Sequence, residues 1–203
     1  MSDNLQNLAS DPAAFRSALR IDTDHGPAPL SSVADDWQTA DFTALDPAWR
    51  RVAGQSVQGG PSRAYLERPR GHSKTADLAA MATWALLSSQ RQLLGLAAAA
   101  DKDQAKFLRD AIDRLVKMNE WLAPVLKVDT YKVTNRLTGS ELTILSSDVG
   151  SSYGPTPDFV LCDELTHWGN ADLWDSLFSS AAKRKNCLVV IISNAGFGEG
   201  ESW

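Results

Sequence analysis

The stretch LERPRGHSKTAD, residues 66–77, resembles a phosphate-binding loop whose glycines are misplaced. The usual pattern is G-x-x-x-x-G-K-[ST], which follows a strand and opens a helix. When the stretch is aligned on Lys74 and Thr75, the two glycine positions hold Arg68 and Ser73. A lysine followed by a threonine before a helix is common. Taken alone, the stretch therefore leaves open both a nucleotide site and a chance match.

The composition is that of an ordinary globular chain. It has 203 residues, of which 43% are hydrophobic and 22% are charged, enough for one sizeable core. Its net charge of −5 means that nucleic acid would have to be held locally, by a loop or groove. No apolar run approaches the roughly 18 residues of a membrane span, and the first residues lack the features of a signal peptide. We therefore expect a cytoplasmic protein with no membrane partner.

The first part of the chain reads as a lead-in to the main domain. We expect residues 1–34 to be loosely attached and partly irregular, with one short helix from Pro12 to about Arg20. A second short helix is expected to open at Asp35-Asp36 and to end at Pro47, because proline lacks the N–H that a helix interior needs. Residues 35–203 are expected to form the main domain.

From residue 64 onward, predicted strands alternate with predicted helices. The strands are expected at 64–67, 93–100, 159–162 and 188–192, and the helices at 74–88, 101–119 and 171–182. Two further strands, around 131 and at 142–145, are expected to form a hairpin. This alternation predicts an α/β fold with a mostly parallel central sheet and helices on both faces.

Both cysteines lie in apolar runs. Cys162 comes near the end of one predicted parallel strand and Cys187 at the start of another, so they should be too far apart for a disulfide. We expect two buried free thiols.

Three polar clusters follow three predicted strands. They are RPRGHSKT (68–75), the acidic pair Asp163 and Glu164, and SNAG (193–196). Ligands of open α/β sheets bind beyond the carboxyl ends of the strands. We therefore expect these clusters to converge in space.

The first two clusters could supply the chemistry of a triphosphate site, which needs phosphate donors, a metal ligand and a group that prepares the attacking water. Lys74 can supply a cation, Thr75 a hydroxyl for Mg²⁺, and the helix start its N–H groups. Asp163 would hold Mg²⁺ through water, and Glu164 would polarise the attacking water as general base. Alternatively, both acids cap the next turn or face solvent.

The third cluster offers small residues and an amide at the same edge of the sheet. Ser193, Asn194, Ala195 and Gly196 could sense whether the γ-phosphate is present, or could form a plain turn after a strand. A lysine loop, a later D-E pair and then S-N-A-G is the order of a P-loop NTPase with an additional strand between the first two motifs. The order therefore predicts that fold.

The order of these motifs also resembles the large subunit of the viral terminases, the motor that packages DNA into tailed-phage heads. Terminase loops often lack the usual glycines and carry an arginine four residues before the lysine, as Arg70 stands before Lys74. The other resembling segments are AAADKDQAKFLRDAIDRLV, TGSELTILSSD, GPTPDFVLCDELTHW, ISNAG and, upstream, Asp36-Trp37-Gln38. The resemblance covers roughly residues 35–203.

This resemblance implies an ATPase that uses ATP and Mg²⁺. It implies that Glu164 activates water and that Gln38 contacts adenine. Thr75 and Asp163 would hold the metal, and residues 193–196 would couple the ATP state to DNA movement. The implied phosphate-loop residues are Arg70, Gly71, His72, Ser73, Lys74 and Thr75.

Some of these roles have plainer alternatives. Arg70 could be an arginine finger acting in cis, or could merely contact phosphate or solvent. Gln38 could be an ordinary polar residue on a helix surface. His72 and His167 read as structural or solvated residues.

The resemblance also implies partners: double-stranded viral DNA, the portal protein, the small terminase subunit and further copies in a homo-oligomeric ring. Complete large subunits continue into a nuclease domain, which we expect to be absent here, so ATP turnover by this chain alone stays open. A helicase-like DNA-remodelling ATPase and a non-catalytic, nucleotide-binding remnant of a prophage gene remain as alternatives.

Overall fold

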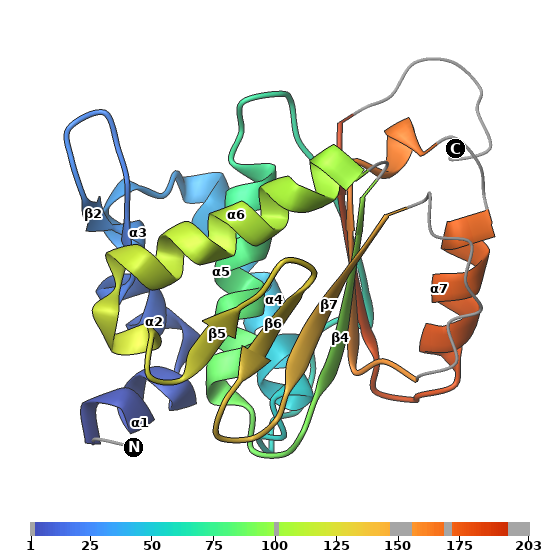
Figure 1. Ribbon diagram of the computed structural model, residues 1–203, viewed down its shortest axis with the longest axis horizontal. Coiled ribbons are helices and arrows are strands. Elements are labelled where there is room, and N and C mark those ends of the chain that lie inside the picture. Colours follow the sequence, from blue (N-terminus) through green and yellow to red (C-terminus); the bar gives the residue numbers. More distant parts are fainter. Residues whose placement is uncertain (1–2, 100–101, 147–155, 169–171, 195–203) are drawn as a thin grey trace.

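A seven-stranded sheet forms the centre of the molecule (Figure 1). The computed structural model describes residues 3–99, 102–146, 156–168 and 172–194. Across the sheet the strand order is β3-β9-β8-β4-β7-β6-β5. The strands are β3 (Arg63–Glu67), β4 (Leu94–Ala99), β5 (Leu126–Val128), β6 (Lys132–Asn135), β7 (Glu141–Ser146), β8 (Phe159–Asp163) and β9 (Leu188–Ser193).

The five strands from β3 to β7 in this order run parallel, as the alternation of elements predicted. The predicted hairpin is confirmed, because β6 pairs antiparallel with β7. The short strand β5, which pairs antiparallel with β6, was not predicted. The α/β, mostly parallel fold is therefore confirmed.

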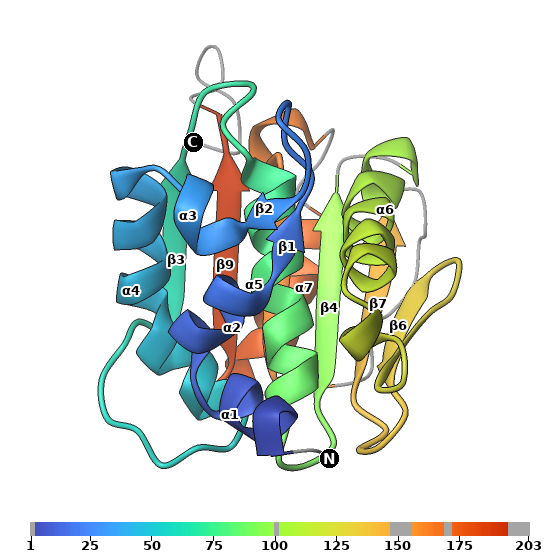
Figure 2. The same cartoon turned by 90° about the vertical axis from the view of Figure 1, so that its left-hand side faces the viewer.

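Helices cover both faces of the sheet (Figures 1 and 2). On one face a large hydrophobic core joins the sheet to α1, α2, α4, α5 and α6; on the other face the helix is α7, over a smaller core. The helices are α1 (Asp3–Ser10), α2 (Pro12–Ala18), α3 (Leu30–Val33), α4 (Asp36–Val52), α5 (Lys74–Ser88), α6 (Lys102–Met118) and α7 (Asp172–Ala182). Two single-turn 3₁₀ helices lie at Glu120–Leu122 and Leu165–His167.

Helix α5 lies between the sheet and the outer helices, and nearly all of its residues are buried. Both helices beside it, α4 and α6, contact it. An apolar helix with neighbours on all sides cannot shift easily, because protein interiors are close-packed. The start of α5, at Lys74, is therefore held in a fixed place at the carboxyl edge of the sheet.

The expectation that Pro47 ends a helix is wrong, since α4 continues to Val52. Proline in a helix interior removes one hydrogen bond and costs about 3 kcal/mol. Ala48, Trp49 and Val52, which follow it, are all buried in the core. Their burial offsets the loss, so the helix persists past the proline.

The expectation of a loosely attached N-terminal segment is also wrong. Phe15 and Leu19 are almost fully buried in the main core. The indole N–H of Trp84 in α5 donates to the carbonyl of Leu8. A short antiparallel pairing of β1 (Arg20–Ile21) with β2 (Ala28–Pro29) orders part of the stretch that was expected to be irregular.

The two cysteines are buried and free, as predicted. Burial raises the pKa of the Cys162 thiol to about 12 and that of Cys187 to about 11, so both stay protonated. In the described part of the chain, no helix is long and apolar enough to cross a membrane.

Candidate functional site

The three polar clusters do meet at the carboxyl edge of the sheet. Strand register aligns Glu67 with Ser193, and Asp163 with Ile192, on neighbouring strands. Just beyond β3, the Arg68 N–H donates to the Ser193 carbonyl over 2.9 Å. The expected convergence is confirmed for the described residues.

The loop between β3 and α5 has an unusual backbone at its end. Ser73, which replaces the second glycine of the usual pattern, has φ 49° and ψ 21°, in the left-handed region that favours glycine. Gly71 also has a positive φ, of 80°. The chain thus keeps a glycine-like backbone at position 73 with a serine in place.

Arg68 replaces the first glycine and has a structural role. Its guanidinium is only 4% exposed and pairs with Asp77 of α5 over 2.5 Å and with Asp41 of α4 over 2.7 Å. It also lies 4.5 Å from the ring centre of Trp37. Burial raises the pKa of Asp77, and the hydrogen bonds from Gln38 and Arg68 oppose this shift. Arg68 therefore joins the start of the loop to two helices.

Lys74, at the first position of α5, is 7% exposed and points back into the loop. Its ammonium donates to the carbonyl of Pro69 over 3.0 Å and to that of Arg68 over 3.3 Å. It also lies 3.2 Å from a carboxylate oxygen of Glu164. The lysine of the loop and the acidic pair, far apart in the chain, thus form one site.

Asp163 ends β8 in a buried position. Its Oδ2 accepts a hydrogen bond from Thr75 Oγ1 over 2.8 Å, while its buried Oδ1 has no partner among the described residues. Burial raises the pKa of Asp163 to about 6; the charge of Glu164 adds to this shift, and Thr75 and Lys74 oppose it. A buried carboxylate oxygen without a protein partner is free to bind a cation or to accept a hydrogen bond.

Glu164 follows in the left-handed region, with φ 51° and ψ 45°. Its Oε1 faces Lys74, while its Oε2 has no hydrogen-bond partner in the described structure and lies 3.7 Å from His167 Nε2. Strained residues cluster at active sites, where the surrounding structure holds them. The backbone turns here so that both acids reach the same edge of the sheet.

A polar network links the acidic turn to the end of β9. Thr166 Oγ1 lies 2.8 Å from Ser193 Oγ and donates to Asn194 Oδ1 over 2.8 Å. Asn194 Nδ2 lies 3.1 Å from His167 Nε2. Ser193 and Asn194 are thus close to Glu164, whereas Ala195 and Gly196 lie outside the described residues.

These groups line a cleft of about 640 Å³, which we call the loop cleft. It is bordered by loop residues 70–75 and by Asp163 and Glu164, so every predicted residue of the phosphate loop faces it. Helix α6 supplies a wall that sequence reasoning missed, made of Gln104, Phe107, Ala111 and Arg114. Their spacing of three and four residues places them on one face of α6, a signal present in the sequence.

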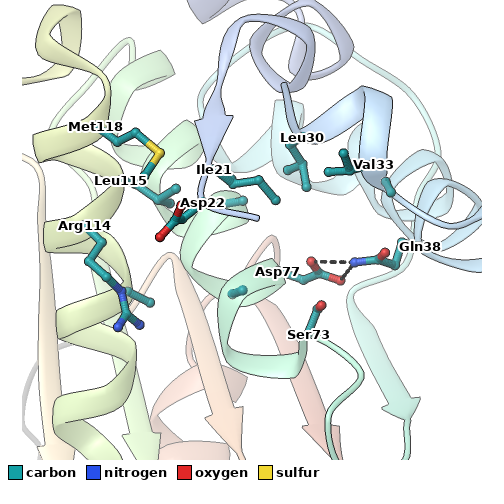
Figure 3. A pocket seen from close by; sticks show the side chains of 14 residues that line it. Ile21, Asp22, Leu30, Val33, Gln38, Ser73, Asp77, Arg114, Leu115 and Met118 are labelled. Carbon is teal, nitrogen blue, oxygen red and sulfur yellow. Dashed lines mark hydrogen bonds between the residues drawn. The ribbon is translucent and has the colours of Figure 1, made fainter. Parts of the chain in front are cut away.

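A second cavity of about 410 Å³, the side pocket, adjoins the loop cleft (Figure 3). The two share Ser73, Ala76, Ala111 and Arg114. The walls of the side pocket are mainly apolar, with Ile21, Leu30 and Val33 from the N-terminal segment.

Gln38 faces the side pocket with its amide already engaged. Its Nε2 donates to both oxygens of Asp77 over 3.0 Å, and its Oε1 accepts from the Asp35 N–H, also over 3.0 Å. Gln38 therefore also fastens the start of α4 to α5. Its predicted contact with adenine stays a prediction.

Most of the chain matches one family of known proteins. A family model described as the terminase large subunit, ATPase domain, matches residues 36–201. The chain belongs to this family. The match begins next to Gln38 and takes in the loop, the acidic pair and the end of β9, so the terminase resemblance is confirmed. No curated protein sequence matches this terminase domain.

Solved terminases share its fold. The HK97 bacteriophage large terminase superposes with a TM-score of 0.74 at 18% identity, covering 95% of this chain and 38% of that one. The ATPase domain of the large terminase from Thermus phage P74-26 gives 0.57 at 17% identity, covering 75% and 70%. A large terminase from a thermophilic bacteriophage, solved in complex with ADP, gives 0.50 at 12% identity, covering 72% and 38%. The present terminase domain thus spans well under half of the HK97 protein.

Proposed function

We propose that this chain binds and hydrolyses ATP, and that it is the motor part of a tailed-phage terminase large subunit that drives viral DNA into the prohead. The observation that carries this proposal is the meeting of Lys74 and Thr75 with Asp163 and Glu164 at one cleft. A cation, a hydroxyl and two carboxylates at the start of a buried helix are the set that phosphoryl transfer needs.

The phosphates would bind at the start of α5. The first N–H groups of a helix have no partner within the helix, and the helix dipole favours an anion there. Lys74 would turn from the carbonyls of Arg68 and Pro69 toward the β- and γ-phosphates. Arg70 and His72 are exposed in the loop and would approach the phosphates from the solvent side. Arg70 is a candidate arginine finger in cis.

The residues beside Lys74 fit Mg²⁺. The unpartnered Oδ1 of Asp163 and the hydroxyl of Thr75 are oxygen donors, and Mg²⁺ typically takes one or two protein oxygens together with phosphate and water. The described residues contain no cluster of three His, Cys, Asp or Glu side chains that would suit a dedicated metal cage. Thr75 and Asp163 would therefore hold the ion, which would neutralise charge on the phosphates.

Glu164 would act as general base toward the attacking water. Its Oε2 is buried without a hydrogen-bond partner and can accept one from water. His167 and Asn194 lie beside it, and through Ser193 they reach the end of β9. Residues 193–196 would pass the state of the γ-phosphate to the part of the motor that moves DNA.

The nucleoside would occupy the side pocket, because that pocket adjoins the loop cleft next to Ala76 and has apolar walls. Gln38 would contact adenine there after releasing Asp77. The large terminase that was solved in complex with ADP shares this fold. Double-stranded DNA, the portal protein, the small terminase subunit and further copies in a ring are the proposed partners. The family match favours this assignment over a helicase.

The test is calorimetric titration of the chain with Mg-ATP. Lys74→Ala should weaken binding by roughly tenfold or more, because it removes a charged contact to phosphate. Lys106→Ala is the matched control, since Lys106 is an exposed lysine of α6 paired with Asp103. Equal affinities for the wild type and Lys74→Ala would refute the phosphate site. Tight binding without ATP hydrolysis, with or without linear double-stranded DNA, would point to the non-catalytic alternative.

A further inference from the structure

One cation at the site has no role in the arrangement so far. Arg114 of α6 borders both the loop cleft and the side pocket, and its guanidinium has no hydrogen-bond or ion-pair partner among the described residues. Figure 3 shows it across the side pocket from Gln38 and Asp77.

The acidic neighbours of Arg114 on α6 pair with other residues. Asp110, one turn before it, pairs with Arg109 over 2.6 Å, and Asp113 pairs with Lys117 over 2.6 Å. Across the side pocket, Asp77 is held by Arg68 and Gln38. Asp77 and the acids of α6 near Arg114 are thus paired with other groups, whereas Asp22, which also lines the side pocket, has no ion-pair partner among the described residues.

The packing of α6 places Arg114 where the loop cleft and the side pocket adjoin. The buried side chains of Leu108, Ile112 and Leu115 fix the inner face of the helix against the core. On the next face, Ala111 lies between the larger Phe107 and Arg114, and it borders both cavities together with Ala76. The small side chains of Ala76 and Ala111 thus border the place where the loop cleft and the side pocket adjoin.

We propose that Arg114 binds the α- and β-phosphates of the nucleotide where they pass from the loop cleft to the side pocket. This inference rests on the proposed ATP site. Lys74 and Arg70 would contact the γ-phosphate end of the triphosphate, next to Glu164. Arg114 would contact the end that is attached to the nucleoside. A guanidinium suits this position because its fork of donors can contact oxygens of two adjacent phosphates.

The test compares Mg-ATP and Mg-ADP binding by competition against a fluorescent ADP analogue. Arg114→Gln should weaken both nucleotides by a similar factor, about tenfold, because the two share the α- and β-phosphates. Arg114→Lys should recover part of the loss, since it keeps the charge without the fork. Arg109→Gln is the matched control on the same helix, because Arg109 is already paired.

Unchanged affinities in Arg114→Gln would overturn the inference, and so would a loss confined to ATP, which would place Arg114 at the γ-phosphate. Arg114 is exposed and unpaired among the described residues, so its replacement should leave the melting temperature unchanged. Failure of the ATP site itself would look different: the wild type would not bind nucleotide, or Lys74→Ala would bind it as tightly as the wild type.

Discussion

Two turns at the carboxyl edge of the sheet each hold a left-handed residue other than glycine, but their side chains differ in what they contact. Ser73 ends the phosphate loop and Glu164 follows β8, and they are the two non-glycine residues with positive φ in the described structure. The Ser73 side chain is exposed and does not cap the helix, whereas the Glu164 carboxylate lies between Lys74 and His167. Equal strain is thus accompanied by an engaged side chain at only one of the two positions, which points to function at Glu164.

Replacement of Glu164 should have the largest effect. Glu164→Gln keeps the size of the side chain but removes the base, so ATP hydrolysis should fall by about 10²–10⁴. Glu164→Gly should lose as much activity. The backbone strain that it relieves, roughly 1 kcal/mol, is offset by the loss of the carboxylate that pairs with buried Lys74, so the free energy of unfolding should change little. Phosphate release and urea unfolding measure the two effects. Wild-type hydrolysis in Glu164→Gln would show that the strained turn does not hold the base.

Restoring the first glycine of the loop should destabilise the folded protein. Arg68→Gly leaves Asp77 buried without its cation, and breaking such a pair costs about 3–5 kcal/mol. Urea unfolding would measure the loss. Arg63→Gly is the control, because Arg63 is an exposed arginine at the start of β3 that contacts the Phe178 ring but has no ion pair among the described residues. A variant as stable as the control would contradict the structural role of Arg68.

The burial of Asp163, next to Glu164, should make the free energy of unfolding depend on pH. Since burial raises the pKa of Asp163 from 3.8 to about 6, the folded protein keeps a proton there that the unfolded chain releases near pH 4. Stability from this group is complete below pH 4 and is lost as the pH rises through 6, by about 3 kcal/mol at most. Without metal, Asp163→Asn should therefore be more stable than the wild type at pH 8 and nearly equal to it at pH 4. A constant difference across that range would contradict the raised pKa.

Restoring the second glycine should have the smallest effect, with the opposite sign to Arg68→Gly. Ser73→Gly relieves a left-handed serine whose side chain makes no capping hydrogen bond, so unfolding should cost roughly 1 kcal/mol more. Mg-ATP affinity should stay within about twofold of the wild type, because the backbone N–H groups keep their places. Thermal melting and calorimetry measure these quantities, and a loss of stability would mean that the serine hydroxyl has a role of its own.

Much of the architecture could be predicted because it depends on local patterns. The helix at 74–88 and the strand beginning at Phe159 were placed correctly from apolar periodicity, and the polar residues after each strand gave the edge at which the site forms. Pro47 and the N-terminal segment were misjudged, because burial of Trp49, Phe15 and Leu19 by distant parts of the chain overrides local signals.

The site was predicted less completely than the fold. Motif order singled out Lys74, Thr75, Asp163 and Glu164 as candidates, and the structure brings them together. The role of Arg68 could not be seen, since its partners come from two separate helices. The left-handed backbone of Glu164 could not be predicted from the sequence, because the surrounding fold imposes it.

The contact between Lys74 and Glu164 should lower the affinity of the proposed site for ATP. Without nucleotide, each of these groups partly neutralises the other, so in the proposed site ATP would compete with a carboxylate for the same ammonium. The affinity for ATP would then be the difference between two pairings of Lys74. As the proposed base, Glu164 would lose its ion pair only when a phosphate draws the lysine away.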